Sequence, residues 1–130
     1  MEDTMFTIDE TEVILNEIAE EMPQELYNEL SGGIVLREEM KLHPKSKDND
    51  LYILGEYHSD SQLGNFIAVY YGSVIRSYGN YSLKNYKNEL RKVLKHEFLH
   101  HLETMAGEVS LAVEDSIELE KYLESWGKSH

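Results

Sequence analysis

The chain has 130 residues, of which 41% are hydrophobic, so it can form one compact domain with a buried core. Its 25 acidic and 12 basic residues give a formal net charge of −13, which would repel phosphate backbones and anionic lipids. Nucleic acids and membranes are therefore not expected partners. The absence of cysteine excludes disulfides, thiol nucleophiles and zinc ribbons, so any metal site must be built from His, Asp and Glu.

The N-terminal sequence MEDTMFTIDETEV is acidic and lacks the basic and apolar regions of a signal peptide. No apolar run approaches the roughly 20 residues that are needed to span a bilayer. These features predict a cytoplasmic protein with one domain over residues 1–130, and we expect it to be a monomer.

The first elements are predicted to be helical. In residues 9–22 (DETEVILNEIAEEM), the apolar positions follow the spacing of one helical face. Pro23 ends this helix and suits the first turn of a short second helix, PQELYNEL. The Ser31-Gly32-Gly33 break leads into residues 34–42, whose loose alternation predicts a strand.

Two further strands are expected in the middle of the chain. Residues 43–50 form a polar turn or loop, and residues 51–57 (LYILGEY) and 65–71 (NFIAVYY) are rich in aromatic and β-branched side chains. A turn-like linker, HSDSQLG, separates these two strands. Residues 72–78 could form another short strand or a turn.

Helices are expected to dominate the rest. The longest helical stretch runs from Leu83 to about Ala106, with Gly107 in the place of a C-cap glycine, and residues 113–126 (VEDSIELEKYLESW) form a closing helix. The chain is therefore predicted to be α+β: two N-terminal helices, a short, mainly antiparallel sheet of about three strands, a long helix and a C-terminal helix.

The long helix contains the sequence His96-Glu97-Phe98-Leu99-His100, an HExxH motif. Residues four apart lie above one another on a helix, so both imidazoles can face one tetrahedral metal, with Glu97 placed to take a proton from a metal-activated water. On a helical projection both histidines flank the apolar face, and Glu97 falls between them and that face. The apolar face comprises Leu90, Leu94, Phe98, Leu102 and Met105. The alternative is an exposed histidine pair on an acidic helix.

The stretch LYILGEYHSDSQLGNFIAVYYGSVIRSYG, followed by VLKHEFLHHLETMAGE and VEDSIELEKYL, resembles the bacterial zincin-like metallopeptidases called minimal zincins. The resemblance runs from about residue 30 onward. It implies a small zincin-like domain, a Zn²⁺ site and hydrolysis of peptide bonds. Many members have HExxHxxGxxD, but here the last two positions of that pattern hold Glu103 and Ala106, and Ala106 cannot bind metal.

A third ligand must therefore come from elsewhere. Asp115 and Glu114 begin the closing helix, whose N-terminus would keep a carboxylate ionised, although both could simply be first-turn acids. The order of preference is Asp115, then Glu114, then Glu118 or Glu120. Glu103 is interpreted as a hydrogen-bonding partner that orients a ligand imidazole, and His101, towards the apolar face, as a core histidine.

The predicted function is a zinc-dependent peptidase that acts on a peptide or protein, with His96, His100 and Asp115 as ligands and Glu97 as general base. An extended substrate could add to the edge of the sheet at residues 65–71. The side chains considered for oxyanion support are Tyr78, Tyr81, Tyr122 and His58. Two alternatives stay open: a zincin-fold metal-binding or interaction module without turnover, and a regulatory protease specific for one protein. Zinc is assigned by analogy, because manganese, iron or nickel would also bind imidazole.

Overall fold

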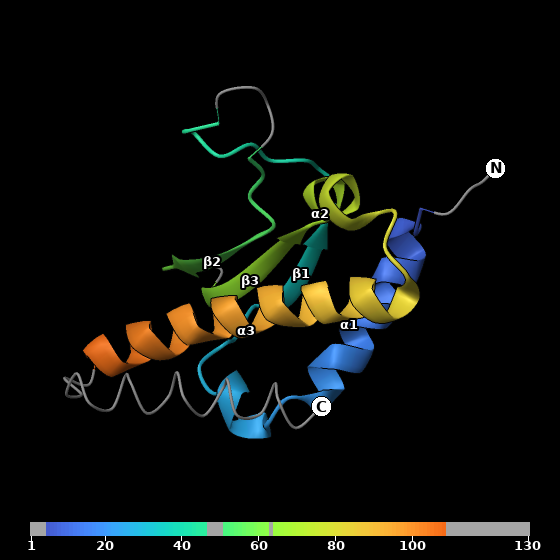
Figure 1. Ribbon diagram of the computed structural model, residues 1–130. Helices are drawn as coiled ribbons and strands as arrows, with labels where there is room; N and C mark the ends of the chain where they lie inside the picture. The colour runs from blue at the N-terminus through green and yellow to red at the C-terminus, as the bar shows by residue number, and fades with distance from the viewer. Residues whose placement is uncertain (1–4, 47–50, 63, 109–130) are drawn as a thin grey trace.

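The computed structural model describes residues 5–46, 51–62 and 64–108, which form a mixed α+β arrangement (Figure 1). Helix α1 spans Ile8–Glu21 and is followed by a single 3₁₀ turn, Gln24–Tyr27. Three strands then form one small sheet, and two more helices follow it. The expected α+β class with about three strands is confirmed, as is the first helix, but the predicted second helix over residues 23–30 is only this 3₁₀ turn.

Helix α1 begins where its sequence supplies a complete capping box. The backbone N–H of Glu10 donates to Thr7 Oγ1 at 3.0 Å, and the Thr7 N–H donates to Glu10 Oε1 at 2.8 Å. From this start, the helical spacing places Ile14, Leu15 and Ile18 on one face, and all three are buried. Helix α1 therefore contributes one wall of the main core.

The sheet is mixed. Its strands are β1 (Gly33–Arg37), β2 (Gly55–Asp60) and β3 (Gly64–Tyr70), in the order β1-β3-β2. Strand β2 is antiparallel to β3, as expected, but β1 is parallel to β3, so the prediction of a mainly antiparallel sheet is wrong for one of its two pairs. After β1 the chain crosses to the far edge to form β2, and the tight β2–β3 turn then brings β3 back through the centre, alongside β1.

Several predicted boundaries are also displaced. The first strand ends at Arg37 instead of continuing to residue 42, and the second begins at Gly55 and includes part of the predicted linker. Residues 72–78 are neither strand nor turn, because β3 leads directly into helix α2 (Tyr71–Tyr78). Gly72 allows this helix to lie against the 39–40 backbone: its N–H donates to Glu39 O at 3.0 Å, and an added Cβ would lie 2.6 Å from Met40 N.

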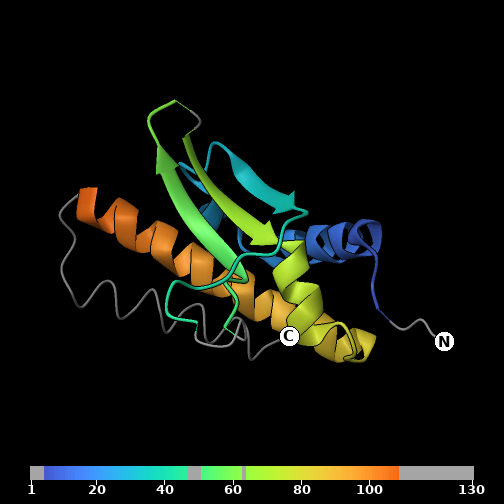
Figure 2. The same cartoon turned by 90° about the horizontal axis from the view of Figure 1, so that it is seen from above.

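Helix α3 spans Leu83–Glu108 and crosses one face of the sheet, with α1 on the same side (Figures 1 and 2). Gly107 lies inside α3, so its predicted role as a C-cap residue is wrong. The predicted closing helix, residues 113–126, lies outside the described residues.

The main core lies between the sheet and the helices α1 and α3. Four side chains of α3 are fully buried there, at the spacing of one helical face: Tyr86, Leu90, Leu94 and Phe98. Strand β3 contributes Ile67 and Val69 to this core, while its alternate residues pack on the opposite face of the sheet. This packing fixes α3 across the sheet.

Ion pairs between α1 and α3 reinforce this arrangement. Arg91 binds both carboxylate oxygens of Glu21, at 2.9 and 3.1 Å, and Lys87 Nζ lies 3.0 Å from Glu17 Oε1. The Arg91 side chain is largely buried and its contact is bidentate, so it holds the two helices in one register more firmly than the more exposed Lys87 pair does.

Candidate functional site

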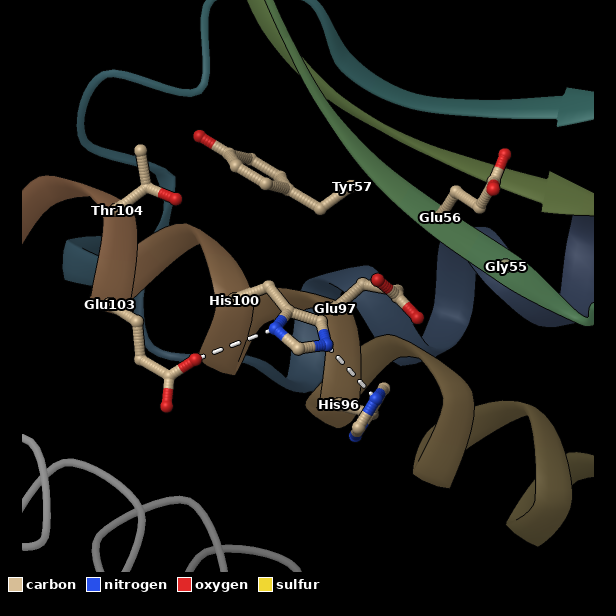
Figure 3. Close-up of a pocket in the computed structure, with 8 residues that line it drawn as sticks. All are labelled: Gly55, Glu56, Tyr57, His96, Glu97, His100, Glu103 and Thr104. Atoms are coloured by element: carbon tan, nitrogen blue, oxygen red, sulfur yellow. Dashed lines mark hydrogen bonds and ion pairs between the residues drawn. The ribbon is translucent and has the colours of Figure 1, made fainter.

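A pocket of about 590 Å³ opens between α3 and the edge strand β2 (Figure 3). Strand β2 provides three consecutive lining residues, and the others come from successive turns of α3. The lining residues are Gly55, Glu56 and Tyr57 from β2, and His96, Glu97, His100, Glu103 and Thr104 from α3. The three HExxH residues that the sequence singled out therefore all line one pocket.

His96 and His100 face each other across one turn of α3. Their Nε2 atoms are 3.0 Å apart and their ring centroids 4.5 Å apart, with the rings nearly perpendicular. Two nitrogens at 2.0–2.1 Å from one tetrahedral zinc would lie about 3.3 Å apart. The pair therefore has close to the spacing that two ligands of one metal ion require.

Glu103 lies one turn further along α3, beside His100. Its Oε1 atom is 3.4 Å from His100 Nδ1, and both side chains are about half exposed, at 47% and 46%. A carboxylate in this place favours a proton on Nδ1, which leaves the Nε2 lone pair of His100 free to bind a metal. Glu103 therefore contacts His100, while the role of that imidazole as a metal ligand stays a prediction.

Glu97 differs from the two histidines because its side chain is only 6% exposed. Burial raises the pKa of Glu97, with a further rise from the Glu56 carboxylate. The nearby His96 and His100 side chains and a hydrogen bond to the Tyr57 backbone act in the opposite direction but do not cancel the rise. The predicted partial burial of Glu97 is confirmed, and burial makes its carboxylate a stronger base.

Another carboxylate in the pocket, Glu56, has the opposite character from Glu97. Burial alone would raise its pKa, but hydrogen bonds from Lys41 Nζ at 2.6 Å and Tyr70 Oη at 2.7 Å outweigh that effect and lower the pKa below its usual value. Glu56 is thus fixed in its ionised form, whereas Glu97 is the carboxylate suited to exchanging protons.

Gly55 allows β2 to approach α3 closely at this point. A Cβ added to it would lie 2.9 Å from Val93 Cγ1, 3.1 Å from Ala68 O and 3.5 Å from Glu97 Cγ. Glycine is therefore required by close packing, and its absence of a side chain lets β2 cover one side of Glu97.

Tyr57 is a pocket residue that the sequence did not single out. Its hydroxyl group is 2.7 Å from Nδ1 of His101, and Nε2 of His101 is 2.7 Å from Asn28 O. Because a carbonyl can only accept, Nε2 carries the proton, and Nδ1 accepts from the Tyr57 hydroxyl. His101 is fully buried, as predicted for a core histidine. In the sequence, the only signal for Tyr57 is that alternate residues of a strand over 55–60 face the same side of the sheet.

The predicted third ligands are not placed. Asp115, Glu114, Glu118 and Glu120 all lie outside the described residues, as does Tyr122. Within residues 5–46, 51–62 and 64–108 there is no group of three or more His, Asp or Glu side chains that could hold a metal ion. A metal ion held by His96 and His100 would therefore need a further ligand that the described residues do not supply.

None of the remaining described side chains considered for oxyanion support lines the pocket itself. His58 stacks on Phe66, with ring centroids 4.8 Å apart, and does not line the pocket. Tyr81 is 43% exposed and also lies outside the lining. Tyr78 lines a neighbouring cavity that shares His96 and Glu97 with the pocket.

The expected peptide-binding edge is also different. Residues 65–71 correspond mostly to β3, which pairs with β1 on one side and β2 on the other, so that segment is not an edge. At the side of the sheet next to the HExxH residues, the end strand is β2.

Comparison with known proteins places the fold among solved structures. The chain is similar to a conserved hypothetical protein from Thermo thermophilus, with 28% identity and a TM-score of 0.68, over 78% of this chain and 99% of the other. No family model matches the chain, and no curated protein matches it. Among the described residues, no helix has the length and apolar character needed to cross a membrane.

Proposed function

We propose that this protein is a zincin-like zinc peptidase, with His96 and His100 as metal ligands and Glu97 as the general base. The observation that carries the proposal is the arrangement of these three side chains at one pocket. Two imidazole nitrogens lie 3.0 Å apart, and a buried carboxylate with a raised pKa projects from the same helix. An exposed histidine pair used only for solubility would not need a buried carboxylate beside it.

The chain's own residues would divide the chemistry between them. A bound zinc ion would polarise the substrate carbonyl and lower the pKa of a water molecule to about 7. Glu97 would take a proton from the attacking water and return it to the leaving amine. Glu103 would hold the proton on His100 Nδ1, so that Nε2 stays available to the metal.

The substrate would be an extended peptide that lies along β2. The backbone of an edge strand offers hydrogen-bonding groups to an added strand, and β2 borders the pocket at Gly55, Glu56 and Tyr57. Binding there would carry a peptide carbonyl past Glu97. This replaces residues 65–71 with β2 as the docking strand.

The third ligand is proposed to come from the acidic residues after α3, with Asp115 preferred over Glu114, and Glu118 or Glu120 after them. The test is metal content by elemental analysis for single alanine variants at these four positions, with Glu12→Ala on the exposed face of α1 as the control. The ligand variant should lose metal by about tenfold or more, while the others and Glu12→Ala should keep it.

The central experiment combines metal content with hydrolysis of unfolded protein substrates. Purified without chelators or a His tag, the native chain should carry about one zinc, and His96→Ala/His100→Ala should carry none. Glu97→Gln should keep the zinc but lose hydrolysis by about 10²-fold or more. No zinc after loading would contradict the proposal. Zinc without hydrolysis of general or specific protein substrates would indicate a metal-binding module instead.

A further inference from the structure

A second cavity of about 400 Å³ adjoins the pocket and shares Gly55, His96 and Glu97 with it. Three segments form its walls: the residues that lead into β2, the end of α2 and the middle of α3. Of the eight residues that line only this cavity, five are apolar or aromatic, namely Tyr52, Ile53, Leu54, Tyr78 and Val93, and the other three are His43, Glu89 and Lys92. A group bound in this cavity would therefore lie directly beside the two residues that the proposed chemistry uses.

The cavity is apolar inside and charged at its opening. Val93 is only 7% exposed, so it lies at the inner wall. Lys92, whose side chain is 71% exposed, pairs with Glu89 at 3.2 Å, which places this ion pair towards solvent. The apolar part of the wall favours an apolar group, and the ion pair at the opening does not require a charged one.

The size of the cavity restricts the ligand. Its volume lies near the lower end of the roughly 300–1,000 Å³ that is typical of small-molecule sites. Two aromatic side chains, Tyr52 from the segment before β2 and Tyr78 from α2, contribute to its walls. Such walls suit one large apolar or aromatic side chain better than a segment of peptide backbone.

We infer that this cavity binds the large apolar or aromatic side chain of one substrate residue next to the bond that is cut. The inference rests on the proposed peptidase function, because the cavity is assigned to a substrate side chain on the ground that His96 and Glu97 line it. A peptide lying along β2 would pass Gly55, where the pocket and the cavity meet, and could place one side chain in the cavity while its carbonyl faces Glu97.

The first test measures binding without hydrolysis. The zinc-loaded full chain is titrated with N-acetyl-L-phenylalaninamide, while the methyl signals of Leu54 and Val93 are followed by NMR. Saturable shifts of both signals are expected, with N-acetyl-L-serinamide binding roughly tenfold or more weakly, since its side chain fills little of the cavity. Equal affinity for the two probes, or no shift at Val93, would overturn the inference.

A pair of variants tests the wall itself. Tyr52→Ala removes one aromatic wall from a half-buried position and should weaken phenylalaninamide binding by about tenfold. Val13→Ala truncates an apolar side chain at an exposed position on α1 that does not line the cavity, and binding should be unchanged. If both variants weaken binding equally, the effect is not specific to the cavity and the inference fails.

The cleavage pattern then separates this inference from the proposed function. If peptide libraries are cut, the products should show a preference for Phe, Tyr, Leu or Met at one position beside the cut bond, and Tyr52→Ala should reduce that preference. Hydrolysis without such a preference would overturn the inference and leave the peptidase function intact. Binding of the phenylalanine probe by a chain that neither holds zinc nor cuts peptides would contradict the proposed function, and it would overturn the assignment of the cavity to a substrate residue.

Discussion

Tyr57 on β2 and His101 on α3 are joined by a hydrogen bond of 2.7 Å between the phenol oxygen and Nδ1. This bond ties the edge strand of the sheet to the helix that carries the histidine pair. On its other side, His101 Nε2 donates to Asn28 O, so the buried imidazole connects three segments of the chain. The distance between β2 and the HExxH residues depends directly on this connection.

His101→Leu should lower the free energy of unfolding by about 2–4 kcal/mol, because it leaves the Tyr57 hydroxyl and the Asn28 carbonyl without their buried partner. Urea denaturation would measure this loss. Metal content should stay at the native level, in contrast to His96→Ala and His100→Ala. Loss of zinc from a folded His101→Leu chain would show that the second histidine of the HH pair is more than a core residue.

Gly55→Ala should destabilise the protein by about 1–3 kcal/mol, because the new Cβ would lie 2.9 Å from Val93 Cγ1. In the double variant Gly55→Ala/Val93→Ala the clash with Cγ1 is absent, so the two changes should cost less together than the sum of their separate effects. Chemical denaturation of the four proteins in this cycle would measure the coupling.

A control for the glycine experiment is available within α3. Gly107→Ala adds a Cβ inside the last turn of α3, and among the described residues no heavy atom outside the adjoining helix backbone lies within 4 Å of it. It should stabilise the protein by about 0.5–1 kcal/mol, since alanine is the better helix former. If Gly55→Ala behaved in the same way, close packing of β2 against α3 at that point would be contradicted.

The sequence predicted best what helical periodicity alone determines. Leu90, Leu94 and Phe98 lie on the predicted face and are fully buried. The same projection placed Glu97 at the border of that face and His101 towards it, and both are buried. Leu102 and Met105 are only partly buried, because α3 continues past the sheet (Figure 1), and the projection carries no information about where the sheet ends.

What the sequence could not predict depends on contacts between distant segments. The parallel pairing of β1 with β3 depends on where the chain crosses the sheet, and no local pattern encodes that crossing. Tyr57 resembled the other eight tyrosines until the register of β2 brought it opposite His101. Likewise, Gly72 and its neighbours form α2 because the helix fits against residues 39–40, although their composition allowed a strand.

Tyr86 gives the protein a predictable sensitivity to alkaline pH. Burial raises the pKa of its phenol to about 12, and the hydrogen bond with Thr11 only partly opposes this rise. The neutral phenol is thus favoured in the folded chain, so its contribution to stability is complete below about pH 10 and decreases as the pH rises from about 10 towards 12. Urea denaturation at about pH 9 and about pH 11 should show a loss of the order of 1–2 kcal/mol.

Tyr86→Phe is the variant that tests this assignment. It removes the titrating group and the 2.7 Å contact with Thr11, so it should lose about 1 kcal/mol at about pH 8. Between about pH 9 and pH 11 it should then lose less stability than the native chain does. An unchanged pH dependence would mean that another group, such as the half-buried Tyr78, whose pKa is also raised by burial, causes the alkaline loss.

Glu97 should show a conflict between stability and activity. Because burial raises the pKa of its carboxyl group, the ionised form costs the folded chain stability, and this loss grows as the pH rises from the unfolded pKa of about 4.3 through the folded value.

The variant Glu97→Gln tests this, because its side chain cannot ionise. Both proteins are treated with a chelator, and the free energy of unfolding of the variant is compared with that of the native chain. The difference should favour the variant more at about pH 8 than at about pH 4. Hydrolysis by the zinc-loaded variant should nevertheless be lost. A Glu97→Gln variant that loses stability relative to the native chain over this pH range would show that contacts of the ionised carboxylate, such as the one to the Tyr57 backbone, outweigh its burial.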